Sequence, residues 1–547
     1  MSRHGHYTWV IGILVLHLIM AVIVARHMSA TYDEPAHLDY GRQLLLHGNP
    51  ERTRSDFDSK MPVSVLNALP SGIAQLLRNW GWMPRMVASL QSLWAARLPT
   101  IAASLVLAYV VGQWSAELYG EWAGRFALLL YAFSPNILAH ATLATTDLYA
   151  ALGAVLSPYC FARFLKHRHL RTALIAALML GLAQLAKFSS PSLFLWQWLL
   201  VVVLYAARRR WHIRVPERRL LVMYGLLSLV LTLGVLQIGF LFHQPIVRLA
   251  NLRLVSNEFQ ALQTVSVLSE LPIPVPGPFV QGLDMMREHE RTGETTGNLY
   301  LLGELRETGR RGFKPFYSYY AVCYLFKEPI ALQLLLVMGL WWMLRHRSMR
   351  DFLVGDACVV FPMLGYVLLM TFTNKIQIGL RWILPSLAFA PIAASAYFAG
   401  WQAWGRRRQI LSCLVLVYLM VSVLSYFPHM IPYTNEFVLD RKLAYKIFAD
   451  SNLSWGQNSD MVMQFIEAHP DVSLNPPAPQ EGRVLVEVNR LVEVFGTSDR
   501  YRWLREQYKP IAHVGYANLL FEVSPQQDPH HGMRLSDSNR TILDAEE

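Results

Sequence analysis

The chain has 547 residues, of which 53% are hydrophobic and only 16% are charged. Soluble globular domains usually carry about 25% charged residues, so the composition excludes an ordinary soluble protein and indicates an integral membrane protein. The net charge of +11 does not indicate a nucleic-acid-binding protein. The basic residues fall in short clusters between long apolar runs, which is typical of cytoplasmic loops.

The four cysteines are scattered, and they form neither a CxxC pair nor a Cys/His ligand spacing. We therefore expect no disulfide framework and no zinc site. No cofactor is required by the sequence. No dedicated metal-ligand cluster is evident, although an acid pair could still hold a divalent ion.

The first apolar run, over 7–24, has a weak basic flank and a poor cleavage site, so it predicts a retained membrane span rather than a signal peptide. A span needs about 20 apolar residues. By that criterion the sequence predicts about eleven transmembrane helices. They lie near 7–24, 89–111, 123–141, 147–165, 172–188, 190–207, 220–241, 329–344, 352–372, 382–401 and 410–427.

Orientation follows from four strongly basic connections, which fall at every second loop: 166–171, 208–219, 345–350 and 405–409. The positive-inside rule then predicts a cytoplasmic amino terminus and an extracytoplasmic carboxy terminus. We expect a transmembrane domain over 1–427 with outer loops 25–88 and 242–328.

Two outer segments have structure of their own. Residues 61–80 carry apolar side chains at helical spacing, which predicts a helix lying in the membrane interface. Residues 428–525 predict a small α/β domain, with a strand in 482–496, a helix over 501–510 and a second strand over 513–523. The segment 526–547 is expected to be disordered.

Asp33 and Glu34 follow the first span in the stretch DEPAHLDYG, and Asp147 opens the fourth. Each could simply mark a helix amino terminus. The functional alternative is a carboxylate near lipid, where partial desolvation raises basicity. Asp33 is then the expected base, with Asp147 at the same cavity. His140 could join them, although a histidine at a helix end is often structural.

Four basic residues fall on the expected outer side, where the positive-inside bias does not place them: Lys60, Lys187, Lys327 and Arg381. One such residue is usually a snorkelling anchor. Several together favour an anionic partner, and at this depth a lipid phosphate is the natural candidate.

Two further outer segments are candidates for ligand contact. The aromatic-rich stretch 312–329 suits sugar stacking but also an ordinary interfacial belt. After the last span, the stretch DSNLSWGQ offers Asn452, Trp455 and Gln457. These side chains suit a hydroxylated ligand, although an ordinary turn would look the same.

In order along the chain, YDEPAHLDYG, SKMP, ATTDLYAAL, LAKFSSP, IGLRWILP and DSNLSWGQ resemble the polyprenol-phosphate-dependent membrane glycosyltransferases of the C-type superfamily. The likeness is greatest to the protein O-mannosyltransferase-like and aminoarabinose-transferase-like group, which is glycosyltransferase family 39-like. It covers roughly residues 30 to 460. The sequence has MP where many relatives have PP, and Ser454 where an acid is commoner.

The resemblance implies an all-α polytopic fold with interfacial helices in the first outer loop and a hexosyl- or pentosyltransferase activity. The sugar donor is expected to be a polyprenyl phosphate, and the acceptor a hydroxyl of a protein, lipid or glycan. The family pattern maps the base to Asp33, with Glu34 beside it and Asp147 as the second-loop acid. It maps the phosphate contacts to Lys60 and Arg381. The bacterial plasma membrane is the expected location.

The expected reaction is a single inverting displacement, in which Lys187 or Lys327 could assist the phosphate contacts. One rival is a secondary transporter or lipid flippase, but transporters tend to show inverted repeats and polar residues at mid-span. A second rival is a glycan ligase or polymerase with a pyrophosphate-linked donor, which would need the same outward cations.

Overall fold

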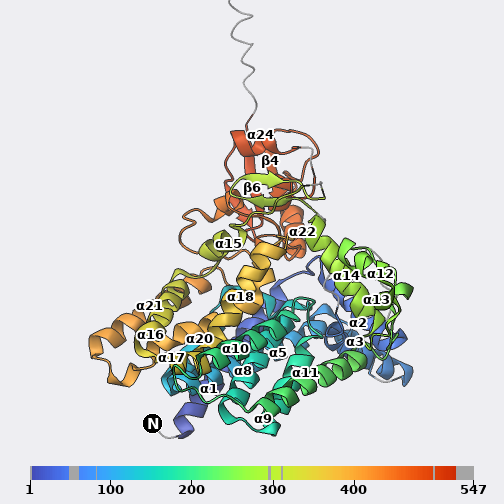
Figure 1. Ribbon diagram of the computed structural model, residues 1–547. Helices are drawn as coiled ribbons and strands as arrows, with labels where there is room; N and C mark the ends of the chain where they lie inside the picture. The colour runs from blue at the N-terminus through green and yellow to red at the C-terminus, as the bar shows by residue number, and fades with distance from the viewer. Residues whose placement is uncertain are drawn as a thin grey trace, which may run out of the picture.

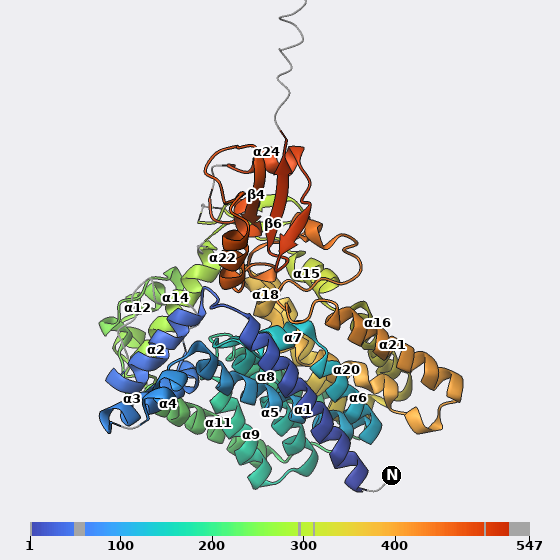
Figure 2. The ribbon, with the colours of Figure 1, turned by 180° about the vertical axis from the view of Figure 1, so that it is seen from behind.

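The computed structural model describes residues 3–48, 61–81, 83–293, 297–309, 312–496 and 499–524. A helical body carries a small domain of mixed helix and strand at one end (Figure 1). We call the described residues between 459 and 523 the tail domain and count 428–458 with the body. The amino terminus lies at the opposite end of the body in both views (Figures 1 and 2). We call the end that carries the tail domain the tail end.

Among the described residues, six helices are long and apolar enough to cross a membrane, and up to eight if each of two bent pairs forms one span. The six are α1 (Arg3–His27), α5 (Leu93–Tyr119), α8 (Asp147–His167), α11 (Arg218–Gly239), α18 (Ala357–Thr373, with its lead-in from Met349) and α21 (Arg406–Leu424). Several apolar side chains on one side of α11, such as Leu226 and Val230, are more than half exposed. Such outward apolar side chains fit contact with lipid.

The other predicted spans are helical but shorter or broken. Helices α9 (Leu170–Ala183) and α10 (Ser192–Ala207) are short. The run 123–141 divides into α6 (Glu121–Ala132) and α7 (Pro135–His140), because Ser134 takes an extended backbone ahead of proline. Eleven apolar runs therefore become helices, although several are not single continuous spans.

Two of the predicted spans are bent pairs of helices. Helices α15 (Tyr319–Lys327) and α16 (Ile330–His346) meet at 112°. The run 382–401 is built from η4 (Leu380–Ile383), α19 (Leu384–Leu387), α20 (Ala390–Ser395) and η5 (Ala396–Phe398), with a 42° bend. Broken backbone at membrane depth is tolerated where other parts of the protein cover it.

The first loop forms α2 (Glu34–His47), α3 (Ser64–Asn79) and α4 (Pro84–Leu90). Helix α3 turns small and polar side chains such as Ser64, Asn67 and Ala68 inward and leaves Leu66, Leu69, Ile73 and Leu76 exposed. This exposed apolar stripe fits the predicted interfacial helix.

The second loop contains η2 (Leu249–Asn251), α12 (Asn257–Thr264), α13 (Ser266–Glu270) and α14 (Gly277–Thr292), followed by the antiparallel strands β1 (Leu299–Leu301) and β2 (Glu304–Arg306). The loop reaches the tail domain, because the backbone N–H of Asn298 donates to the carbonyl of Val494.

The tail domain has a four-stranded sheet in the order β3-β4-β6-β5. Its elements are α22 (Ser459–Ala468), β3 (Val472–Leu474), β4 (Gly482–Glu487), α23 (Val488–Leu491), α24 (Arg502–Gln507), β5 (Ala512–Val514) and β6 (Asn518–Val523). The predicted single strand over 513–523 is wrong, since Gly515 and Tyr516 take left-handed backbone and turn it into a hairpin. The segment 526–547 lies outside the described residues.

Candidate active site

Asp33 and Glu34 have opposite surroundings although they are adjacent in sequence. Asp33 is the residue before helix α2, and its side chain is 29% exposed. Glu34 is the first residue of α2 and is completely buried. Successive helical residues point in different directions, so the two carboxylates meet different partners.

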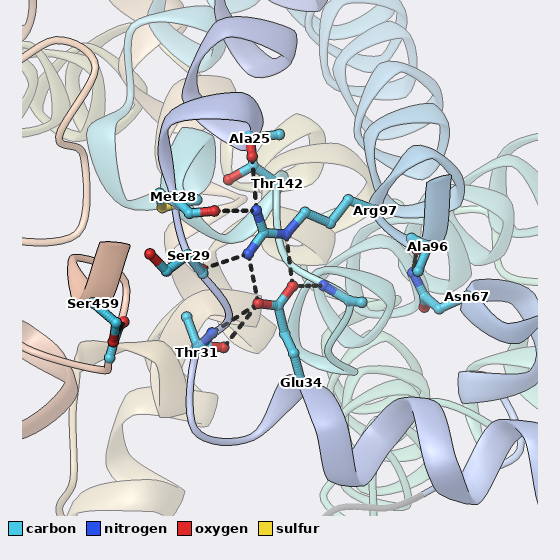
Figure 3. A network of polar contacts seen from close by, with 12 residues as sticks. Ala25, Met28, Ser29, Thr31, Glu34, Asn67, Ala96, Arg97, Thr142 and Ser459 are labelled. Carbon is cyan, nitrogen blue, oxygen red and sulfur yellow. Dashed lines mark hydrogen bonds and ion pairs between the residues drawn. The ribbon is translucent and has the colours of Figure 1, made fainter. Parts of the chain in front are cut away.

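Glu34 belongs to a closed network beneath the site, drawn in Figure 3. Its two carboxylate oxygens accept hydrogen bonds from Nε and Nη2 of Arg97 at 2.8 and 2.7 Å. They also accept bonds from the backbone N–H groups of Thr31 and Ala144. Every oxygen of this carboxylate is occupied by protein donors, which fits a positioning role.

Arg97 completes this network. Its guanidinium also donates to the carbonyls of Ala25, Met28 and Ser29, at the end of α1 and in the turn after it (Figure 3). The Glu34–Arg97 pair therefore fastens the first loop to α1, to α5 and to the loop before α8. Sequence reasoning missed Arg97, although a lone arginine within an apolar run is a signal of such a role.

Four other predicted residues form one chain of charges. Arg381 Nη1 lies 2.6 Å from Asp33 Oδ2 and 3.8 Å from Asp147 Oδ2. Lys187 Nζ lies 2.6 Å from Asp147 Oδ1. The structure thus brings together side chains that are more than 300 residues apart in sequence.

The Arg381 segment is held by the stretch that follows the last span. Gly379 has a φ of 142°, and a Cβ there would meet Ser451 Oγ at 2.2 Å. The next N–H, of Leu380, donates to Asn452 Oδ1 at 3.0 Å. The guanidinium carbon of Arg381 lies 4.0 Å from the ring centre of Trp455, a cation–π arrangement that orients the charge.

Arg381 also has unused donor capacity. Its Nε is buried and has no hydrogen-bond partner among the described residues. A buried donor without a partner costs free energy, so this atom is a natural contact for an oxygen-rich ligand.

A cavity of about 650 Å³ opens between the helical body and the tail domain. The body contributes Tyr32, Asp33, Ile378, Arg381, Asp450 and Trp455, and the tail domain contributes Glu487, Arg490, Glu493, Phe495, Gly496, Arg500 and Tyr501. Both charge signs line this cavity, which suits a ligand that carries an anionic group together with hydroxyls.

Three predicted ligand contacts instead bond to the protein. Lys327 Nζ donates to the carbonyls of Ile431, Tyr433 and Asn452. Gln457 accepts from the backbone N–H of Trp455 through Oε1 and donates to the carbonyl of Leu453. Asn452 Nδ2 donates to the hydroxyl of Tyr319 at 3.0 Å. These side chains shape the turn that carries Trp455 and do not line the cavity.

The remaining predicted residues have mixed outcomes. His140 is buried, and its ring centre lies 5.8 Å from that of Trp455. Lys60 lies outside the described residues. In the aromatic stretch 312–329, Tyr319 and Tyr320 are buried, and no residue of the stretch lines the cavity.

Asp450 is a cavity residue that sequence reasoning passed over. It stands first in the stretch DSNLSWGQ and begins η8 (Asp450–Asn452). Burial raises the pKa of its carboxyl to about 7. At Asp33, burial opposes ionisation, but the Arg381 guanidinium outweighs it and holds the pKa below its usual value. The same cavity thus holds one carboxylate that stays ionised and one that titrates near neutrality.

Among the described residues, no group of three or more His, Cys, Asp or Glu side chains could hold a metal ion. The nearest acids, Asp33 and Asp147, each face a basic side chain.

Comparison with known proteins gives one family match. Residues 80–236 match the family model for dolichyl-phosphate-mannose-protein mannosyltransferase. The matched part covers α5 to α11 for most of their length and includes Asp147 and Lys187. No curated protein matches the sequence.

Solved structures give distant likenesses. ArnT from Cupriavidus metallidurans bound to undecaprenyl phosphate is 11% identical, with a TM-score of 0.48 over 95% of this chain and 98% of that chain. The apo Archaeoglobus fulgidus oligosaccharyltransferase is 13% identical, with a TM-score of 0.47 over 86% of this chain and 59% of that chain. Over residues 80–236, which include the motifs ATTDLYAAL and LAKFSSP, the family match confirms the resemblance to the membrane glycosyltransferases of the C-type superfamily.

Proposed function

We propose that the protein transfers a sugar from a polyprenyl-phosphate donor to a hydroxyl acceptor at the tail end, which the basic loops predict to be extracytoplasmic. The family match supports glycosyl transfer from a lipid-phosphate donor. The observation that carries the proposal is the cavity in which Arg381 lies beside Asp33 and has an Nε without a hydrogen-bond partner in the part of the chain that the structure describes.

The donor phosphate is proposed to bind at Arg381. A guanidinium binds phosphate oxygens through several donors at once, and here Trp455 and Asp33 fix its plane. Lys187 lies one ion pair away and acts on Arg381 through their shared partner Asp147. Cations fixed in advance at a leaving phosphate stabilise the charge that develops on it, which is commonly the largest contribution to catalysis.

The reaction is then a single displacement. The acceptor oxygen attacks the anomeric carbon, the bond from that carbon to the phosphate oxygen breaks, and the configuration inverts. Asp33 is the base expected from the sequence, and in this structure it is paired with Arg381. It would become free to act when the donor phosphate draws the guanidinium toward itself.

The first experiment measures release of free polyprenyl phosphate by the purified protein from a panel of polyprenyl-phosphate sugars, with a membrane extract as acceptor source. We expect release with one donor class, and we expect D33N to reduce it by about 10²–10⁴-fold. The matched control is D39N on the same helix, because Asp39 is exposed and bonds only Gln43 among the described residues.

The outcomes separate the rival functions. Undiminished release by folded D33N would remove Asp33 from the reaction. No release with any monophosphate donor, together with release from pyrophosphate-linked donors, would point to a glycan ligase or polymerase. Transport of intact lipid-linked sugar without turnover would point to a flippase.

A further inference from the structure

Asp450 is the carboxyl of the cavity that the protein leaves most available. Its Oδ1 accepts a hydrogen bond from the backbone N–H of Ser451 at 2.5 Å. Its Oδ2 has no hydrogen-bond partner, and neither oxygen forms an ion pair with the residues that the structure describes. Asp33 and Asp147 differ in this respect, since each is paired with a basic side chain.

The backbone around Asp450 is held in an uncommon conformation. Its φ is 57°, in the left-handed region that few residues other than glycine adopt. Its N–H donates to Oδ1 of Asn489 in the tail domain at 2.7 Å, and the hydroxyl of the next residue, Ser451, donates to the carbonyl of Ile378. Backbone strain of this kind persists where the surroundings impose it, and it occurs often at functional sites.

The backbone at Asp450 is thus held both by the helical body and by the tail domain. Ser451 joins it to the segment that carries Arg381, and Asn489 joins it to the tail domain. These contacts hold Asp450 at the wall of the cavity that Asp33 and Arg381 also line.

We propose that Asp450, and not Asp33 as the sequence predicts, is the carboxyl that takes the proton of the acceptor hydroxyl, while Asp33 stays paired with Arg381 and holds it at the donor phosphate. This inference rests on the proposed function. As the acceptor oxygen bonds the anomeric carbon, its O–H bond breaks and the proton passes to the Asp450 carboxylate. The bond from carbon to phosphate oxygen breaks with its electron pair, and polyprenyl phosphate leaves with one additional negative charge.

The charges around Asp450 suit this role. Burial raises its pKa to about 7, while the N–H of Ser451 and the charge of Arg381 act in the opposite direction. The other titratable groups that face it are Asp33, Glu487, Tyr32 and Tyr319, and Arg490 lines the same cavity. A base whose pKa lies near the working pH combines a useful ionised fraction with a strong pull on the proton.

The test compares turnover by the wild type, D450N, D450E and D33N between about pH 5.5 and 8.5. We expect wild-type kcat to rise with pH through about 7, since the ionised carboxyl is the active form. D450N should lose about 10²–10⁴-fold in kcat together with this rise, and D450E should recover part of both. D33N should keep the rise in its residual activity while its donor KM increases.

A second measurement follows the carboxyl without turnover. A carboxyl whose pKa is raised by folding contributes stability that is present below its unfolded pKa and lost as the pH rises through its folded pKa. The Tm of D450N relative to that of the wild type should therefore increase between about pH 4 and pH 7 and stay constant at higher pH. D460N, at an exposed position of α22, is the control that should follow the wild type.

Each outcome decides. The proposal would be overturned if folded D450N had the same kcat or the same pH profile as the wild type. It would also be overturned if the curves of Tm against pH for D450N and the wild type ran parallel. Absence of turnover in the wild type with every donor would refute the proposed function, and the catalytic role of Asp450 with it. If the wild type turned over a donor and D450N kept the same pH profile, only the role of Asp450 would be refuted, and the proposed function would stand.

Discussion

At the scale of single residues, neighbouring charges of the same sign have separate tasks. Asp33 faces the cavity and Arg381, whereas Glu34 is closed off by Arg97 and backbone N–H groups. A buried charge is tolerated only when it is paired and hydrogen-bonded, and Glu34 meets both conditions. The position of Asp33 therefore depends on a neighbour whose carboxylate is bonded entirely by protein donors.

E34Q is expected to destabilise the protein by about 3–5 kcal/mol, because it leaves the buried guanidinium of Arg97 without a countercharge. The measurement is thermal unfolding of the purified protein in detergent. E506Q is the matched control, since Glu506 forms an exposed pair with Arg502 on α24 and should change stability little. Equal Tm values for E34Q and E506Q would contradict a stabilising role of the Glu34–Arg97 pair.

At the scale of elements, close approach of helices depends on small residues. Gly339 on α16 lies so near α20 that a Cβ would meet the carbonyl oxygen of Ala393 at 2.1 Å. Gly234 on α11 has open space around the same position. Both glycines stand inside apolar helices, and only their packing distinguishes them.

G339A should destabilise the protein by about 1–3 kcal/mol, because the added methyl group forces α16 and α20 apart. G234A is expected to stabilise by up to about 1 kcal/mol, since alanine favours a helix interior over glycine. Fluorescence-detected thermal unfolding of the two variants compares them directly. A G339A variant as stable as G234A would show that the helix contact yields without cost.

At the scale of the whole molecule, the tail domain completes the cavity instead of standing apart from it. Asn489 is fully buried. Its Oδ1 accepts from the N–H of Asp450, and its Nδ2 donates to the carbonyl of Ser454. This single amide holds both ends of the turn that carries Asp450. The tail domain therefore fixes the geometry of a segment that belongs to the helical body.

N489A is expected to loosen residues 449–455, at a cost of about 1–3 kcal/mol for the two lost bonds. Hydrogen exchange of that segment should become faster while exchange in β4 and β6 stays slow. Donor turnover should fall in parallel. E481Q, at an exposed position before β4, should leave both measurements unchanged. If hydrogen exchange of residues 449–455 in N489A stayed as slow as in the wild type, the tail domain would not hold this segment in place.

The sequence by itself determined the membrane class, the apolar helices and the order of the motifs, because these depend on local composition and on periodicity within about 20 residues. It also predicted that Asp33, Asp147, Lys187 and Arg381 belong to one site, and the structure brings them together. The role of each in the reaction stays a prediction.

Only the tertiary structure decided which charged side chains face the cavity. Lys327 and Arg381 both stand at the edge of an apolar run in the sequence. In the structure, Lys327 donates to three backbone carbonyls, whereas Arg381 lines the cavity. In the sequence, Asp450 looks like part of an ordinary turn. In the structure, its N–H donates to Asn489, 39 residues later, and this bond fixes its backbone. Partners so distant in sequence are chosen by the packing of the whole chain, and the energy of a buried charge depends on those partners.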